Sequence, residues 1–345
     1  MNNLAPLAMA SSHLSARETS QKLLLSVCGL RVEIPTRRGL LVALDDISFS
    51  IAPGEILGFV GESGAGKSIT GMAILGLLDP PGRIAAGEIR LRDRRIDTLS
   101  QREMRRIRGK EIGAVFQDPL MSLNPLLQIG EQLIETIRTH LPVSQTQATE
   151  RALALMRAVG IPAPEARFTA YPHQFSGGMR QRIVIALALC AEPRLIVADE
   201  PTTALDVSIQ AQVLQLLKTL CREQGTAMLL VTHDMGVIAE TADRVAVMYA
   251  GRIVELGAVE DVIRNPVHPY TRGLMGAIPS LQRITGPLAQ IDGSMPRLNA
   301  RPTGCAFHPR CPNAVDRCRT QSPAVEVKAG RQVACWMPWL HREAA

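Results

Sequence analysis

The sequence predicts an α/β domain built on an open parallel sheet, and three observations lead to this class. A glycine-rich loop with the pattern G-x-x-x-x-G-K-S, residues 61–68, lies between a short apolar run and a proline-free helical run. Further short apolar runs end in polar or charged residues. Hydrophobic residues make up 46% of the 345-residue chain and aromatic residues only 3%. We therefore expect an aliphatic core and about two domains of ordinary size.

The glycine-rich loop predicts a phosphate-binding site. Its glycines allow successive backbone N–H groups to face phosphate oxygens, and the N-terminus of the following helix adds partial positive charge. Lys67 can reach the β- and γ-phosphates, and the Ser68 hydroxyl can bind Mg²⁺. A chance glycine-rich turn would not explain the strand before the loop and the helix after it. The predicted phosphate-binding residues are Gly61, Glu62, Ser63, Gly64, Ala65, Gly66, Lys67, Ser68 and Ile69.

The remaining elements follow from periodicity and turn residues. Two antiparallel strands joined by the basic turn 36–39 precede the loop. A helical insertion between residues 120 and 175 interrupts the core strands, and Ser144 caps one of its helices. The predicted strands are 23–34, 41–51, 55–60, 87–91 (an edge strand), 112–116, 195–198 and 226–231, and the predicted helices are 69–78, 97–108, 145–159 and 183–190.

Polar side chains follow the predicted core strands where each strand ends. Gln117, Asp199 with Glu200, and His233 each come directly after an apolar run or within two residues of it. The carboxyl edge of an open parallel sheet is where ligands bind, so we expect these groups to lie together with the loop. Gln117 can hold Mg²⁺ or orient the attacking water, Asp199 can hold Mg²⁺, and Glu200 can polarise the water. Taken singly, Gln117 would be an ordinary surface residue and His233 a structural one, whereas an exposed acidic turn would not explain the apolar run that leads directly to Asp199 and Glu200.

A second helix N-terminus can also bind an anion. Ser176, Gly177 and Gly178 precede an apolar helix, so a hydroxyl and free N–H groups can face a phosphate there. An ordinary helix cap is the alternative interpretation.

Charge and hydropathy limit the possible partners. The net charge is +6, and nine basic residues crowd between Arg90 and Lys110. They can indicate nucleic acid or an anionic membrane surface, but acids are interleaved among them, so a solvated face is favoured and no nucleic acid is expected. The longest apolar run, residues 183–191, is too short to span a membrane. The first 20 residues lack a secretory pattern and are expected to form a flexible arm, which favours a cytoplasmic location.

The seven cysteines fall into two groups. Cys28, Cys190 and Cys221 lie among apolar neighbours and are expected to be buried. Cys305, Cys311, Cys318 and Cys335 cluster in the last 41 residues. In a cytoplasmic chain such a cluster favours a metal site over disulfides, with iron–sulfur, zinc and free thiols as the alternatives.

The order of these motifs resembles the ATP-binding subunit of an ABC transporter. The phosphate loop, Gln117, Ser176-Gly177-Gly178, Asp199-Glu200, Ala204-Leu205-Asp206 and His233 occur in the family's order between residues 61 and 234. The resemblance implies an ATPase domain over residues 21–264, with a RecA-like core, an antiparallel β subdomain and a helical subdomain at about 120–190. In the family two subunits face head to tail. Each ATP lies between one subunit's phosphate loop and the other's Ser-Gly-Gly segment.

The resemblance also assigns roles to individual residues. Glu200 matches the general base, His233 the switch histidine, Gln117 the Q-loop and Asp206 the D-loop. Ser176 and Gly178 match the contacts made to the γ-phosphate of the partner's ATP. The sequence departs from the family in two places. Phe175 and Met179 flank the Ser-Gly-Gly segment, and no aromatic residue lies between positions 36 and 46 to stack on adenine. Aliphatic side chains, Arg37 or Arg38, or a residue that the sequence does not identify, are the candidates for that contact.

The C-terminal part resembles the extension of oligopeptide and dipeptide importer ATPases. The segment Asn265-Pro266-Val267-His268-Pro269-Tyr270 and the four clustered cysteines carry this resemblance, and residues 265–345 are expected to form the extension. It implies a 4Fe–4S cluster on those cysteines. It also implies two permease partners, a second and distinct ATPase subunit, an extracytoplasmic binding protein acting indirectly, and a place on the cytoplasmic face of the inner membrane. Alternatives are import of nickel, glutathione or a peptide-like antibiotic, or a non-transport ATPase acting on DNA or ribosomes.

Overall fold

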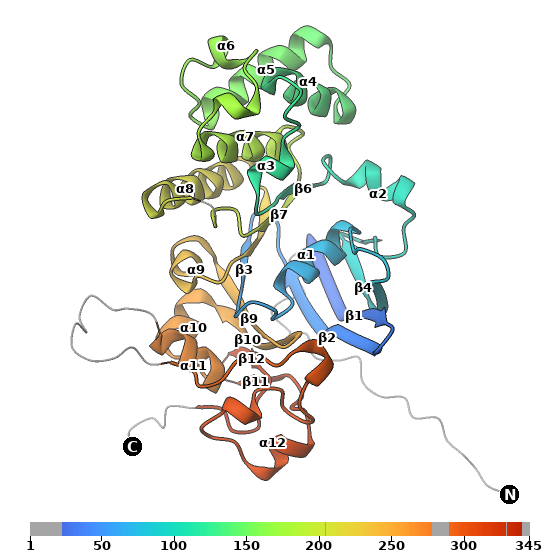
Figure 1. Ribbon diagram of the computed structural model, residues 1–345, viewed down its shortest axis with the longest axis vertical. Helices are drawn as coiled ribbons and strands as arrows, with labels where there is room; N and C mark the ends of the chain where they lie inside the picture. Colours follow the sequence, from blue (N-terminus) through green and yellow to red (C-terminus); the bar gives the residue numbers. More distant parts are fainter. Residues whose placement is uncertain (1–22, 204, 278–289, 329, 340–345) are drawn as a thin grey trace, which may run out of the picture.

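The computed structural model describes residues 23–203, 205–277, 290–328 and 330–339, so the expected N-terminal arm and Ala204 lie outside the described residues. The molecule is elongated, with a layer of helices at one end, two sheets in the middle and the C-terminal part at the other end (Figure 1).

The larger sheet has eight strands in the order β11-β12-β10-β9-β3-β8-β7-β6. β3 pairs in parallel with β8 and β9, and the parallel pairing continues through β7 to β6. This part confirms the predicted parallel sheet, to which β10, β12 and β11 add antiparallel pairs. The strands are β3 (Ile56–Val60), β6 (Ile112–Val115), β7 (Leu195–Asp199), β8 (Ala227–Val231), β9 (Arg244–Tyr249), β10 (Arg252–Ala258), β11 (Glu326–Lys328) and β12 (Arg331–Val333).

Both faces of the parallel region are buried, which is why its strands are continuous apolar runs. Successive side chains of β3 point to opposite faces. Ile56 and Val60 join one core cluster, whereas Leu57 and Phe59 join the other.

The helices are α1 (Lys67–Leu75), α2 (Gln101–Ile107), α3 (Pro119–Ser122), α4 (Ile129–His140), α5 (Gln145–Ala158), α6 (Pro164–Arg167), α7 (Gly177–Leu189), α8 (Val207–Gln224), α9 (Met235–Thr241), α10 (Val259–Arg264), α11 (Pro269–Gly276) and α12 (Asp316–Thr320), with short 3-10 turns η2 (Pro172–Gln174), η3 (Leu298–Ala300) and η4 (His308–Arg310). Within the described ranges, no helix is both long and apolar enough to cross a membrane.

The smaller sheet is antiparallel, in the order β2-β1-β4-β5. Its strands are β1 (Leu25–Thr36), β2 (Gly39–Ile51), β4 (Arg83–Leu91) and β5 (Arg94–Arg95). Thr36 faces Gly39 at the end of the β1–β2 ladder, which confirms the predicted turn. The prediction of an edge strand at 87–91 was wrong, because β4 begins at Arg83 and lies between β1 and β5.

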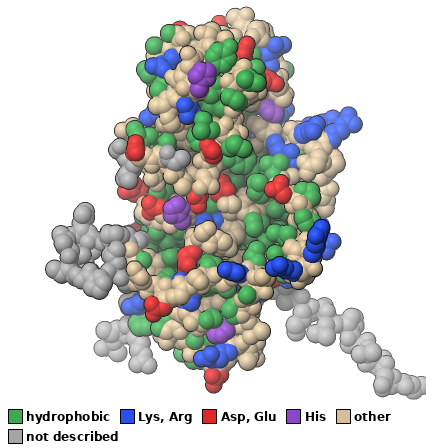
Figure 2. All heavy atoms as spheres, in the orientation of Figure 1, with side chains coloured by type: hydrophobic (Ala, Val, Ile, Leu, Met, Phe, Trp, Pro, Cys, Tyr) green, Lys and Arg blue, Asp and Glu red, His purple; other side chains and the backbone are tan. Residues whose placement is uncertain are grey.

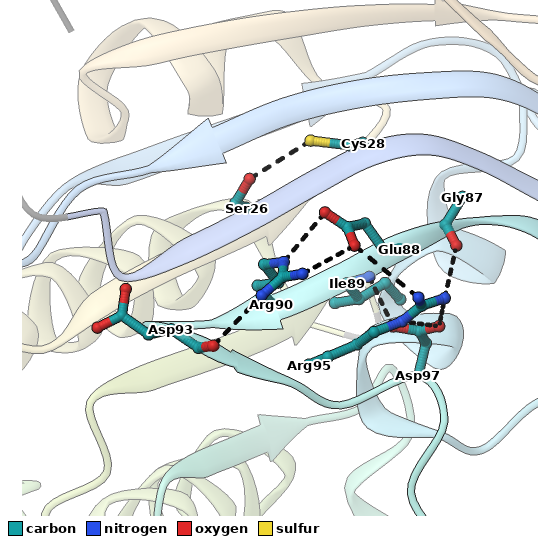
Figure 3. Close-up of polar contacts among 9 residues, drawn as sticks. All are labelled: Ser26, Cys28, Gly87, Glu88, Ile89, Arg90, Asp93, Arg95 and Asp97. Atoms are coloured by element: carbon teal, nitrogen blue, oxygen red, sulfur yellow. Dashed lines mark hydrogen bonds and ion pairs between the residues drawn. The ribbon is translucent and has the colours of Figure 1, made fainter. Parts of the chain in front are cut away.

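The basic segment on this sheet is interleaved with acids in space as well as in sequence. Arg90 contacts the Glu88 carboxylate at 3.0 and 3.1 Å, and Arg95 donates to Asp97 at 2.9 Å (Figure 3). Lys and Arg side chains lie along the edge that carries α2, on the right of Figure 2. These pairs support the interpretation of a solvated face.

One cysteine lies elsewhere than predicted. Cys28 is exposed, with its sulfur 3.6 Å from the Ser26 hydroxyl (Figure 3), because its side chain points outward from β1. Cys190 and Cys221 are buried as predicted, and burial raises the pKa of each thiol to about 12.

Several helix ends differ from the predicted ones, for local reasons. α1 ends at Leu75 because Gly76 adopts the left-handed conformation, with φ 62°. α2 begins only after Ser100, which forms a capping box with Glu103. α7 begins at Gly177 rather than at 183. The helix predicted at 145–159 is confirmed as α5, with Ser144 as its cap.

The C-terminal part is continuous with the large sheet. β12 pairs with β10, and the completely buried Glu255 of β10 accepts the N–H groups of Val267 and His268 and pairs with Arg331 of β12 at 3.2 Å. Breaking a buried ion pair of this kind typically costs about 3–5 kcal/mol. The predicted boundary at 264/265 stays a prediction.

His268 makes the stability of this region depend on pH. It is completely buried at the N-cap of α11, where its Nδ1 accepts the Tyr270 N–H at 3.0 Å. Burial lowers the pKa of His268 from 6.5 to about 3. Because the folded pKa is depressed, this contribution to stability is fully present above pH ~6.5 and is lost as the pH falls toward 3.

We expect His268 to lower the free energy of unfolding by about 1.4 kcal/mol between pH 7.5 and pH 5.5. His268→Asn keeps a capping acceptor but does not titrate. Urea unfolding at the two pH values should therefore show a smaller pH-dependent loss in the variant than in the unmodified chain. The same pH dependence in both proteins would contradict the assignment.

Candidate active site

The glycine-rich loop connects the end of β3 to the start of α1, as predicted. Gly66, at the N-cap of α1, has φ 104°, a conformation that side-chain-bearing residues rarely adopt. A Cβ on Gly61 would lie 2.3 Å from the carbonyl oxygen of Met248, so no larger residue fits beside β9. The loop therefore has its shape because of these glycines.

Lys67 lies inside the loop. Its Nζ donates to the carbonyl oxygens of Gly61 at 2.8 Å and Glu62 at 3.1 Å. Burial lowers the pKa of Lys67, and the nearby carboxylates of Glu200 and Asp199 oppose this effect. The ammonium group is thus fixed where it can meet phosphate oxygens.

Two predicted Mg²⁺ ligands lie next to each other. The Ser68 hydroxyl donates to Asp199 Oδ1 at 2.9 Å. Two neighbouring oxygen ligands of an octahedral Mg²⁺ at ~2.1 Å are about 3.0 Å apart, so the observed spacing fits one small cation. Burial raises the pKa of Asp199, which a nearby cation would offset. The residues present therefore fit Mg²⁺.

Glu200 is held in a strained conformation directly after β7. Its φ is 46°, which costs on the order of 1–3 kcal/mol for a residue with a side chain. Its carboxylate accepts the Thr203 hydroxyl at 2.8 Å and lies 3.3 Å from His233 Nδ1 and 3.4 Å from Gln117 Nε2. Burial opposes ionisation, but the hydrogen bonds from Thr203 and His233 lower the pKa of Glu200. Glu200 is therefore a carboxylate at neutral pH, as a general base must be.

These groups surround one cleft of about 780 Å³, a volume within the range typical of small-molecule sites. Most of the predicted site residues line it, together with a segment that the sequence did not indicate. The lining residues are Ser63, Gly64, Ala65, Gly66, Lys67, Ser68, Ile69, Gln117, Glu200, His233, Met295, Pro296, Arg297 and Leu298. A cleft with a phosphate loop, a cation site and a carboxylate base has the groups needed to transfer a phosphoryl group to water.

The other predicted residues are not among those that line the cleft in the described part of the chain. Ser176 caps α7, where its Oγ accepts the Met179 N–H at 3.4 Å. Gly178 packs closely against α8, since a Cβ there would lie 2.8 Å from Ile209. Asp206 is exposed at the N-cap of α8. The structure therefore does not bring Ser176, Gly178 or Asp206 into the lining of this cleft.

The C-terminal part holds the phosphate loop through contacts that the sequence did not reveal. Tyr270 Oη accepts the Glu62 N–H at 3.0 Å, and Arg310 pairs with the Glu62 carboxylate at 2.8 Å. No local pattern could have indicated these contacts, because 208 and 248 residues separate the partners.

The four C-terminal cysteines share one small lobe. The Cys305 N–H donates to the Cys318 carbonyl at 2.8 Å. Burial raises the pKa of Cys305 and Cys311, and raises that of Cys335 to about 12, with added repulsion from the other three thiols. Across the described ranges, no three or more His, Cys, Asp or Glu side chains are placed to hold a metal ion. This geometry does not support the iron–sulfur prediction.

Comparisons with known proteins agree with the site. Residues 44–203 match the ABC transporter family, and residues 254–318 match the C-terminal region of oligopeptide/dipeptide transporters. The chain is 46% identical over 315 residues to the dipeptide transport ATP-binding protein DppD of Bacillus subtilis, covering 91% of this chain and 94% of that protein. The oligopeptide transport ATP-binding protein OppD of Salmonella typhimurium gives the same identity and coverage. DppD of Escherichia coli is 44% identical over 316 residues, covering 91% of this chain and 97% of that protein.

Solved structures show the same fold. A dimeric ATP-binding cassette in a post-hydrolysis state with ADP and Pi has a TM-score of 0.61 and 29% identity, covering 68% of this chain and 98% of that chain. The cbiO1 component of an ABC transporter complex from Clostridium perfringens has a TM-score of 0.61 and 26% identity, covering 71% of this chain and 92% of that chain. The chain is thus an ABC transporter ATP-binding subunit. Within that class it belongs to the oligopeptide/dipeptide transporter family.

The contacts of Glu200 lead to a test of its role. We propose that Glu200 is the general base, and expect Glu200→Gln to bind ATP normally but to hydrolyse it about 10²–10⁴-fold more slowly in the assembled transporter. Glu223→Gln, an exposed site on α8, is the matched control and should leave the rate unchanged. Phosphate release under saturating Mg²⁺ and ATP measures both. Near-normal turnover of Glu200→Gln would refute the assignment.

Proposed function

We propose that this chain hydrolyses ATP to energise the import of di- or oligopeptides through partner permeases. The observation that carries the proposal is similarity over 91% of the chain to ATP-binding proteins of dipeptide and oligopeptide transport. The similarity includes the C-terminal region, which distinguishes this family from other ABC ATPases. The cleft with its phosphate loop and Glu200 supports the catalytic part of the proposal.

The geometry supports a hydrolytic step with a defined role for each residue. Lys67 and the loop N–H groups hold the β- and γ-phosphates. Ser68, Asp199 and Gln117 would hold Mg²⁺, which would supply positive charge to offset that on the phosphate oxygens. Glu200 accepts the proton of the attacking water, and His233, 3.3 Å away, orients the carboxylate. The Thr203 hydroxyl donates a hydrogen bond to the other carboxylate oxygen of Glu200, Oε2, and so holds the carboxylate in place.

We further propose that each ATP site is completed by a second subunit. Ser176 and Gly178 are not among the residues that line the chain's own cleft, so we assign them to the γ-phosphate of ATP bound to the partner, with Asp206 alongside. By analogy with peptide importers, the partner is a distinct ATPase chain. An isolated subunit would then hydrolyse ATP poorly, because its own cleft lacks these donors.

The permease contact is proposed at the surface that follows Gln117. Three large apolar side chains are exposed there: Leu120 (57%), Met121 (86%) and Leu126 (81%). Exposed apolar side chains that lie close together typically mark an interaction site. Docking of two permease subunits here would place the chain on the cytoplasmic face of the inner membrane. Because this surface follows Gln117, the permeases would also connect the ATP site to the extracytoplasmic binding protein that delivers the cargo.

Co-purification tests this assembly. With the full chain as bait, we expect two permeases and a second ATPase to be recovered in detergent. Met121→Asp should reduce permease recovery at least tenfold while ATP binding is retained. Val327→Asp, also at an exposed apolar position, is the matched control. Salt-sensitive recovery of DNA or ribosomes without permeases would contradict a transport role.

We also propose, from the family resemblance, that the four C-terminal cysteines bind a 4Fe–4S cluster. Two observations support this proposal: the four cysteines share one lobe, and repulsion from the other three thiols contributes to the raised pKa of Cys335. Thiolates that lie close together repel one another unless a cation offsets their charge. A cluster would act as a structural staple for a small lobe, since ATP hydrolysis transfers no electron.

Anaerobic purification distinguishes the metal alternatives. We expect a brown protein with about four iron and four sulfide per chain. Cys335→Ser should lose the cluster, whereas Cys28→Ser should keep it because Cys28 lies on β1. A colourless protein with one zinc per chain and no sulfide would reject the cluster.

A further inference from the structure

The nucleotide cleft has a second wall, which comes from the C-terminal part of the chain. Met295, Pro296, Arg297 and Leu298 line the same cleft as the phosphate loop. Leu298 begins η3, which packs against β2. Residues more than 200 positions after the phosphate loop therefore face it across the cleft.

This wall is anchored on both sides. Before it, Arg310 donates to the carbonyl oxygens of Ile291 and Asp292 at 3.1 and 2.7 Å. After it, Arg301 pairs with Asp45 of β2 at 3.3 Å. Met295 and Leu298 are themselves half-buried and pack against the hydrophobic core. The wall is thus held in place by the protein itself.

The two ends of the cleft differ in chemistry. Lys67, Ser68, Gln117, Glu200 and His233 make one part charged and polar, which suits a triphosphate with its cation. The wall instead presents a thioether, a proline ring and a leucine side chain, with the Arg297 guanidinium beside them. Such groups pack on the faces of a flat, weakly polar ring. A nucleotide has the same division into a charged and a flat apolar part.

The wall also lies near a stretch of the sequence that lacks an aromatic residue to stack on a base. No aromatic residue lies between positions 36 and 46 to stack on a base. Leu298 borders a neighbouring hollow together with Leu40 and Val42 of that same stretch. The wall therefore lies beside the strand from which an aromatic residue would otherwise be expected.

We propose that Met295, Arg297 and Leu298 form the base-binding wall of the ATP site and contact the purine ring of the bound nucleotide. This inference rests on the proposed function, in which the cleft binds ATP. It adds that the C-terminal part supplies the base contacts while the loop supplies the phosphate contacts.

The test distinguishes contacts to the base from contacts to the phosphates. Calorimetry with the full chain and Mg²⁺ measures the affinities for ATP and for inorganic tripolyphosphate, which has no base. We expect Leu298→Ser and Met295→Ser each to weaken ATP binding about tenfold, which corresponds to roughly 1.4 kcal/mol, without changing tripolyphosphate binding. Leu298→Met, which keeps an apolar side chain, should retain ATP affinity, as should Val327→Ser at an exposed position in β11.

Three outcomes would overturn the inference. Unchanged ATP affinity in both serine variants would show that the wall does not touch the base. Equal losses for ATP and tripolyphosphate would show that it only supports the phosphate loop. If the unmodified chain bound neither compound, the proposed function would fail as well, and this inference with it.

Discussion

The parallel pairing of β3 with β8, and of β8 with β7, determines where the phosphate loop, the Asp199–Glu200 pair and His233 lie. Phe59 pairs with Val231, and Asp199 pairs with Val231 from the other side. The phosphate loop, the Asp199–Glu200 pair and His233 therefore leave neighbouring strands at nearly the same height. A slip by one residue would turn each strand's side chains to the opposite face and separate Ser68 from Asp199. The apolar runs that fill both cores thus also fix the register of the site.

Features with a local physical cause could be predicted from the sequence. The phosphate loop, the Ser144 cap and the polar residues at strand ends each depend on a few neighbouring residues, and the structure places them where the sequence indicated. Helix ends were less predictable. The left-handed conformation of Gly76 ends α1, and the Ser100 cap starts α2, within sequence patterns that continue to favour helix. Strands β9 and β10 and the true extent of β4 were missed, because their limits depend on partner strands. The exposure of Cys28 depends on which face of β1 points outward.

Contacts between distant segments could not be predicted at all. Arg310, Tyr270 and the wall around Leu298 act on the loop at Gly61–Ser68 from the other end of the chain. No spacing or composition links these residues, and only the fold brings them together. The C-terminal part, which resembles the extension of peptide-importer ATPases, contacts the phosphate loop directly. Its strand β12 continues the main sheet, and its side chains hold Glu62.

The pairing of Arg310 with Glu62 has a consequence for biosynthesis. The two residues are 248 positions apart. At about 5–20 residues per second, a ribosome needs roughly 12–50 s to add the second after the first. During that interval the nascent chain has its phosphate loop but not the arginine. Strand β12 is made later still, so β10 presents an unpaired edge from the time its own residues are made until residues 331–333 follow. Chains that stop before residues 331–333 would keep this edge exposed, and an exposed edge strand favours aggregation.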